Sequence, residues 1–150
     1  MKKLFFTALT FLCVSTSFSQ WSMRSVDNGF DEPYKIALTA TNNGSFLKLE
    51  NVEGDIFFYI QEGYFCDDAP LVELVFVVNG QNVKYSVYGT TNSESDCVFF
   101  CTDLLNHEIL NSFKKCSSIK IRINQDYCDT YIYTFNMSQS TSALNFVINQ

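Results

Sequence analysis

The stretch Val72–Tyr88, VELVFVVNGQNVKYSVY, contains two alternating apolar segments on either side of Asn79-Gly80. An Asn-Gly pair adopts the positive φ angles of a tight two-residue turn at little cost. In the second segment the Val and Tyr side chains share one face, while Lys84 and Ser86 share the other. The stretch therefore predicts an antiparallel hairpin with one buried face.

The same period-two alternation recurs along most of the chain, interrupted by Asn, Gly, Asp and Ser turns. The chain also contains 15 Phe and 8 Tyr, residue types that are enriched in strands. We expect further strands at Tyr34–Thr41, Phe46–Val52, Ile56–Gln61, Ile119–Ile123 and Tyr131–Phe135. The pattern predicts a mainly β fold, an antiparallel β-sandwich or open barrel of about seven strands.

One segment follows a helical period instead. Apolar side chains recur there at spacings of four, four and three, namely at Leu105, Ile109, Phe113 and Cys116. These spacings predict one amphipathic helix over about 103–116, packed on the sheets. The last residues, 138–150, are compatible with a short second helix or with a final strand.

The N-terminus has the three zones of a cleavable secretory signal peptide. Lys2 and Lys3 precede the short apolar run LFFTALTFLCV, and a tail of small residues ends at Ser19. The apolar run is shorter than the roughly 18 residues that span a bilayer. We expect residues 1–19 to be the signal peptide, residues 20–150 to form a single β-rich domain, and the protein to be exported to the periplasm or secreted.

Charge restricts the classes of partner. Cleavage after Ser19 would remove two lysines and no acid, which leaves 8 basic against 16 acidic residues and changes the net charge from −6 to −8. An acidic surface is repelled by phosphate groups. We therefore expect no nucleic-acid partner and, because no later segment is long and apolar enough, no membrane span.

Five cysteines remain after the leader, and an exported protein can oxidise them. Cys116 lies on the apolar stripe of the expected helix and is the candidate for a buried free thiol. The disulfide candidates are Cys66, Cys97, Cys101 and Cys128. If the run CVFFC is a straight strand, its two cysteines lie roughly 13 Å apart and cannot pair with each other.

No catalytic, cofactor or metal motif stands out. A Ser-His-Asp or Cys-His mechanism would need His107, the only histidine, and nothing in its surroundings marks it as catalytic. The cysteines form no CxxC pair, and the paired acids fall in expected turns without calcium-loop spacing. We expect the protein not to be an enzyme and to carry no cofactor.

Two of the expected strands, Ile56–Gln61 and Tyr131–Phe135, carry a row of aromatic side chains on one face. Phe57 and Tyr59 oppose the apolar face of their strand, and Tyr131 and Tyr133 oppose a face with Ile132. One aromatic face of a sandwich belongs to the core, and a second one is either a ligand platform or a covered layer.

The mature chain as a whole resembles the small exported domain of the VasI/TagO-type accessory proteins of the type VI secretion system and of related uncharacterised bacterial proteins. The matching segments are Trp21 with Asp27–Asp31, Phe46–Leu49, Val72–Val78, Lys84–Tyr88, Leu110–Cys116, Ile119–Ile123 and Phe135–Leu144. The resemblance implies a β-rich, non-enzymatic exported domain, with Cys116 at a position where relatives have a small Ala. The four disulfide candidates have no counterpart in that pattern.

These observations favour an exported, non-catalytic protein that acts through protein–protein contacts in the cell envelope. The alternative is a small-molecule or glycan-binding module that uses an aromatic sheet face. Sequence alone identifies no specific partner for either function.

Overall fold

The computed structural model describes residues 21–149 except 28, 30–31, 62 and 103–106. Within those residues the chain forms ten strands and two helices. The strands are β1 (Ser22–Val26), β2 (Tyr34–Ala40), β3 (Phe46–Val52), β4 (Asp55–Gln61), β5 (Leu71–Val78), β6 (Gln81–Tyr88), β7 (Thr90–Thr91), β8 (Cys97–Thr102), β9 (Cys116–Asn124) and β10 (Tyr131–Asn136). The helices are α1 (His107–Lys115) and α2 (Ser140–Ile148).

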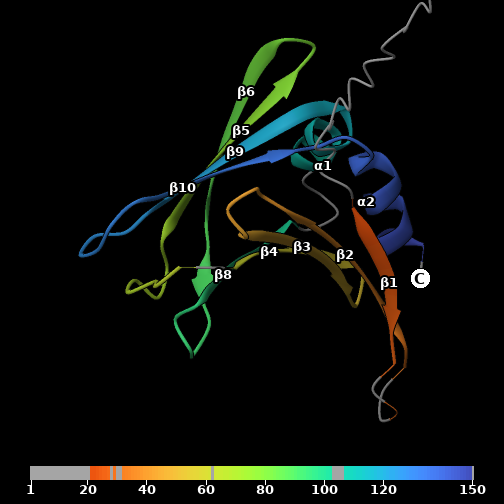
Figure 1. The fold of residues 1–150 in the computed structure, drawn as a ribbon, viewed down its shortest axis with the longest axis horizontal. Coiled ribbons are helices and arrows are strands. Elements are labelled where there is room, and N and C mark those ends of the chain that lie inside the picture. The colour runs from red at the N-terminus through yellow and green to blue at the C-terminus, as the bar shows by residue number, and fades with distance from the viewer. Residues whose placement is uncertain (1–20, 28, 30–31, 62, 103–106, 150) are drawn as a thin grey trace, which may run out of the picture.

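The strands form two antiparallel sheets. The larger one has the order β1-β2-β3-β4-β8-β7, and the smaller one has the order β10-β9-β5-β6. The helices lie together at one side of the two sheets, where α2 packs against β1, β2 and β3 and α1 packs against β5, β9 and α2 (Figure 1). The expected mainly β sandwich is confirmed, with a second helix in addition to the one expected.

The hairpin expected at Val72–Tyr88 forms as predicted. Val78 pairs with Gln81 at its end, so the loop consists of two residues. Asn79 and Gly80 have φ angles of 51° and 77°. Both angles are positive, as a tight turn that follows the twist of the two strands requires.

The helix prediction was too long at its C-terminal end. α1 ends at Lys115, and Cys116 is the first residue of β9. A register irregularity pairs Val77 with Ser118 but Val78 with Cys116, so Ser117 is an extra residue in β9. This bulge turns both Cys116 and Ile119 toward the core, although they are three positions apart and a regular strand would turn them to opposite faces. The expected helix was extended to Cys116 because this residue follows Phe113 by three positions, a helical spacing. Residues 103–106 lie outside the described part.

The C-terminal segment, for which a helix and a strand were both possible, is the helix α2. Its residues Ala143, Leu144 and Val147 are completely buried. Their spacing of one and three places them on one helical face. That face packs against the larger sheet, which explains why the segment folds as a helix despite its Ser and Thr content.

Aromatic contacts in the core join helix α1 to the larger sheet. Phe58 of β4 and Phe100 of β8 stack with ring centroids 5.0 Å apart. Phe113 of α1 meets Phe58 edge-on at 5.2 Å and Trp21 at 5.8 Å. Phe113 therefore connects the helix layer to the larger sheet.

Neither of the two helices in the described residues is long and apolar enough to cross a membrane. The segment 1–19, expected to be a signal peptide, lies outside the described residues.

Candidate functional site

The outer face of the larger sheet carries three aromatic rings beyond the core. In β4 the residues Ile56, Phe58 and Ile60 are buried, so Phe57 and Tyr59 point to the opposite side. Antiparallel pairing with β8 sets Phe99 opposite Tyr59.

Phe57, Tyr59 and Phe99 form what we call the outer aromatic cluster. Its ring centroids lie 6.1 Å apart for Phe57 and Tyr59, 6.3 Å for Phe57 and Phe99, and 5.6 Å for Tyr59 and Phe99. All three separations fall in the range of favourable aromatic contacts. The three side chains are only half-buried, because no further layer of the described residues covers them.

Two charged residues of β3 adjoin this cluster. The ammonium of Lys48 lies 3.7 Å from the ring centroid of Tyr59 and 2.8 Å from Oε2 of Glu50. Burial, followed by the charge of Glu50 and a hydrogen bond to it, raises the pKa of Tyr59 above its ordinary value. Tyr59 is therefore a neutral phenol at physiological pH, held between a cation and a carboxylate.

An open hollow of about 280 Å³ lies beside the cluster. Its lining residues are Lys48, Tyr59, Gln61, Asn92, Glu94, Asp96, Cys97 and Phe99. Aromatic rings and acidic side chains thus line one space, a combination found where small polar ligands bind.

Asn92 holds the acidic side of the hollow in shape. Its Nδ2 donates to Oδ1 of Asp96 at 2.7 Å. Its Oδ1 accepts from the backbone N–H groups of Asp96 and Cys97 at 3.1 and 3.0 Å. These three bonds fix the turn that leads into β8, so Asp96 has a defined position relative to the rings.

Cys97 lines the hollow but is a poor nucleophile. Burial raises the pKa of its thiol to about 11, and the positive charge of Lys48 opposes this rise without cancelling it. The thiol therefore stays protonated at neutral pH, whereas nucleophilic attack needs the thiolate. The side chain of His107, the histidine considered in the sequence, is not among the described side chains.

The second aromatic face considered in the sequence belongs to the core. Tyr133 of β10 is buried and stacks between Phe135 at 6.4 Å and Tyr131 at 6.2 Å. Tyr131 in turn meets the buried ring of Phe65 edge-on. Of the two candidate platforms, only the one on β4 faces outward.

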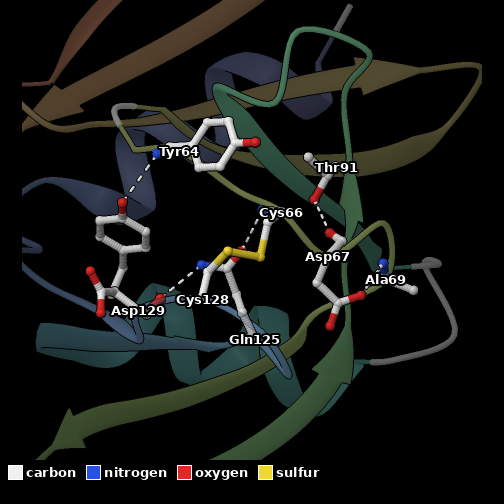
Figure 2. The surroundings of a disulfide bond; sticks show 9 residues. Tyr64, Cys66, Asp67, Ala69, Thr91, Gln125, Cys128 and Asp129 are labelled. Carbon is white, nitrogen blue, oxygen red and sulfur yellow. Dashed lines mark hydrogen bonds between the residues drawn. A yellow bond between two sulfur atoms is a disulfide. The ribbon is translucent and has the colours of Figure 1, made fainter.

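At one end of the sandwich, Cys66 is disulfide-bonded to Cys128, with Cα atoms 6.3 Å apart (Figure 2). Cys66 lies in the segment between β4 and β5, and Cys128 lies between β9 and β10. The buried side chain of Gln125 reinforces the same link. Its Oε1 accepts from the N–H of Cys66 and its Nε2 donates to the carbonyl of Asp129, each at 2.8 Å (Figure 2).

The β4–β5 segment is also tied to β7. Thr91 donates from its hydroxyl to the carbonyl of Asp67 at 2.6 Å (Figure 2). Its N–H donates to the carbonyl of Asp68 at 3.0 Å. The end of the sandwich that adjoins the hollow is therefore fixed by one covalent bond and several hydrogen bonds.

Of the four disulfide candidates, Cys66 and Cys128 are bonded to each other, and neither Cys97 nor Cys101 forms a disulfide in the structure. Both lie on β8 with their side chains on its outer face. They cannot reach each other along a straight strand, and the other two candidates are bonded together.

Cys116 is a buried thiol at the start of β9. Its Sγ lies 3.3 Å from the carbonyl oxygen of Phe113, to which the thiol donates. Burial raises its pKa to about 12. A small protonated thiol therefore fills the junction between helix and strand.

Sequence reasoning found the rings of Phe57 and Tyr59 but missed Lys48 and Phe99. Lys48 appeared as an ordinary polar position of an alternating strand. Only the register, which sets Lys48 opposite Tyr59 and Tyr59 opposite Phe99, brings these side chains together. The turn Asn92–Asp96 carried a weak signal, since Asn and Asp are typical of turns whose side chains bond the backbone.

No protein-family model matches the chain. No curated protein matches its sequence. Among solved structures, the fold is similar to that of invasion associated protein B from Bartonella henselae, with a TM-score of 0.58 and 12% sequence identity. The match covers 86% of this chain and 92% of that one. The likeness extends to the fold, that of a small β-rich protein.

Proposed function

We propose that this protein is an exported, non-catalytic binding protein that makes protein–protein contacts through the outer aromatic cluster. The carrying observation is that Phe57, Tyr59 and Phe99 gather on the solvent side of a sheet, next to a Lys48–Glu50 ion pair. Interface centres are enriched in aromatic residues, and a few such residues supply most of the binding energy.

Burial of the cluster by a partner would be favourable for two reasons. Half-buried rings still expose apolar surface, and its removal from water contributes about 25 cal/mol per Å². The rings are also held by one another and by Lys48, so little side-chain entropy is lost on binding.

Export is part of the proposal. The leader at residues 1–19 supports it, and the Cys66–Cys128 bond fits an oxidising compartment. The resemblance to VasI/TagO-type accessory proteins supports a role in the cell envelope. The structural neighbour is an invasion associated protein, which is compatible with a non-catalytic function.

Site-specific photocrosslinking tests the contact surface. A photoreactive phenylalanine replaces Gln61, at the rim of the hollow, or Ile132, which is exposed on the other sheet. We expect a discrete crosslinked protein from position 61 and none from position 132. The Tyr59→Ala/Phe99→Ala double variant should abolish the crosslink. The proposal is wrong if both positions give the same products or if the double variant crosslinks as well as the wild type.

N-terminal sequencing of the protein recovered from its native host tests export. We expect Gln20 as the first residue. An intact Met1 terminus on a protein found only inside the cell would contradict that part of the proposal.

A second candidate, glycan binding, is favoured by the hollow. Sugars stack their apolar faces on aromatic rings and donate hydroxyl hydrogen bonds to carboxylates, and Tyr59, Glu94 and Asp96 line the same space. Titration calorimetry against a panel of envelope oligosaccharides tests it. If the hollow binds glycans, the wild type should release or absorb heat with an oligosaccharide, Glu94→Gln should not, and position 61 should give no protein crosslink. If the cluster binds a protein, no oligosaccharide should give heat and position 61 should crosslink.

A further inference from the structure

The strand β6 is an edge of the smaller sheet. It pairs with β5 on one side, and no described strand pairs with its other side. In Figure 1 the β5–β6 hairpin extends away from the helices, with β6 along the outer border of the sheet. The free edge is eight residues long, from Gln81 to Tyr88.

The hairpin geometry identifies the backbone groups on this edge. In a two-residue hairpin the residues that flank the turn, here Val78 and Gln81, exchange both backbone hydrogen bonds. Because the pattern alternates, the odd-numbered residues of β6 bond to β5. The backbone groups at the free edge are then those of Asn82, Lys84, Ser86 and Tyr88.

The side chains beside this edge leave apolar surface uncovered. Val83, Tyr85 and Val87 face the core yet are only half-buried, whereas the facing residues of β5 are fully buried. Tyr85 is held in place, because its hydroxyl lies 3.0 Å from Oγ of Ser112 in α1. The edge therefore combines open backbone groups with a rigid, partly exposed apolar stripe.

Natural sheets usually protect such an edge with prolines, bulges or several charges. β6 contains no proline and a single charged residue, Lys84. Its register with β5 runs without a bulge from the Leu71–Tyr88 pair to the Val78–Gln81 pair. The edge is therefore continuous, long and weakly protected.

We propose that β6 pairs antiparallel with β6 of a second copy of this chain, about a two-fold axis at Tyr85. This register sets Val83 opposite the partner's Val87 and Tyr85 opposite the partner's Tyr85. Lys84 then faces the partner's Ser86, and these two residues exchange backbone hydrogen bonds. Two four-stranded sheets become one continuous sheet of eight strands.

Alternative registers are less favourable. A shift that moves the axis to Lys84 puts two lysines directly opposite each other, which is destabilising. A shift in the other direction moves the axis to Ser86 and sets Val83 opposite the partner's Gly89, beyond the end of the strand. A shift by one residue sets the free backbone groups of one chain opposite residues of the partner whose own groups already bond to β5. The side chains of β6 are thus self-complementary in one register.

This interface does not use the outer aromatic cluster, which lies on the other sheet. It is also small, because a single strand from each chain contributes the pairing, and interfaces below about 1,200 Å² are typically weak or transient. We therefore expect a dimer that forms with rising concentration rather than an obligate one.

Sedimentation velocity of the chain from residue 20 onward, from about 10 µM to about 1 mM, tests the proposal. We expect the weight-average mass to rise toward twice the monomer value. Ser86→Pro removes a free-edge N–H that makes no bond to β5, so the fold should survive and the dimer should not form. Ser86→Ala retains the N–H and should dimerise as the wild type does.

A charge swap tests the register. Ser86→Lys places the introduced lysine opposite the partner's Lys84 and should weaken dimerisation by about tenfold. Lys84→Glu added to Ser86→Lys creates two opposite-charge pairs and should restore it. Fluorescence of Trp21, the single tryptophan, reports whether each variant is folded.

A wild type that stays monomeric at 1 mM would overturn the proposal, as would a folded Ser86→Pro variant that dimerises normally. Failure of the charge swap to restore a weakened dimer would overturn the register.

Discussion

Cys66 and Cys128 are disulfide-bonded across 62 residues of sequence. Closing a loop of that length in the unfolded chain lowers its entropy, and the chain-entropy relation gives about 4 kcal/mol of stabilisation. We expect Cys66→Ser/Cys128→Ser to lower the free energy of unfolding by about that amount in a urea titration followed by Trp21 fluorescence. Cys101→Ser is the control and should change it little. An unchanged urea midpoint in the double variant would contradict the assignment.

Gln125 should be difficult to replace, because it satisfies two backbone groups at once. Gln125→Leu leaves the N–H of Cys66 and the carbonyl of Asp129 without their partner, and we expect a loss of about 1–3 kcal/mol. Gln125→Glu retains the acceptor but sets a carboxylate against the Asp129 carbonyl. Its loss of stability relative to the wild type should shrink as the pH falls toward about 4, where the new side chain is protonated and can donate. A pH-independent difference between the two variants would count against this pairing.

Stability should fall at alkaline pH through the buried thiols. Burial raises the pKa of Cys116 from its ordinary 9.0 to about 12 and that of Cys97 to about 11. The folded state therefore keeps the neutral thiols, and their stabilising contribution is full below about pH 9 and is lost as the pH rises through 11 to 12. Urea titrations between pH 7 and 11 should show this loss. Cys97→Ala/Cys116→Ala should show a shallower decline, and an identical slope would contradict the assignment.

Gly89 lies where the chain leaves β6 for β7 and crosses between the two sheets. A Cβ at this position would lie 2.7 Å from Cγ1 of Val98 and 3.1 Å from Cγ2 of Val72, both in fully buried side chains. Gly89→Ala should lower the free energy of unfolding by about 1–3 kcal/mol. In Gly89→Ala/Val98→Ala the space opens, so the combined loss should be smaller than the two separate losses added together. Strict additivity would show that the clash is relieved elsewhere.

Local patterns predicted the parts of the fold that depend on local physics. Asn79-Gly80 favours one turn geometry whatever surrounds it, and the alternation on both sides sets the buried face. Cys116 shows the opposite case. Its inward orientation depends on a bulge at Ser117 that is defined only by pairing with β5.

The sequence predicted individual residues of the candidate site but not which of them lie together. The outward rings of Phe57 and Tyr59 follow from strand alternation alone. Their association with Lys48 and Phe99 depends on registers between strands that are distant in sequence. The choice of Cys128 as the partner of Cys66 likewise depends on two turns meeting at one end of the sandwich, which no spacing encodes.

If the protein is exported as proposed, the bond between Cys66 and Cys128 affects how it withstands extracellular proteases. A single proteolytic cut anywhere between the two cysteines leaves the two fragments covalently attached. The enclosed segment includes β5, β6, β8 and α1. A nicked molecule thus keeps every one of its strands on one connected body, and loses pieces only after the disulfide has been reduced.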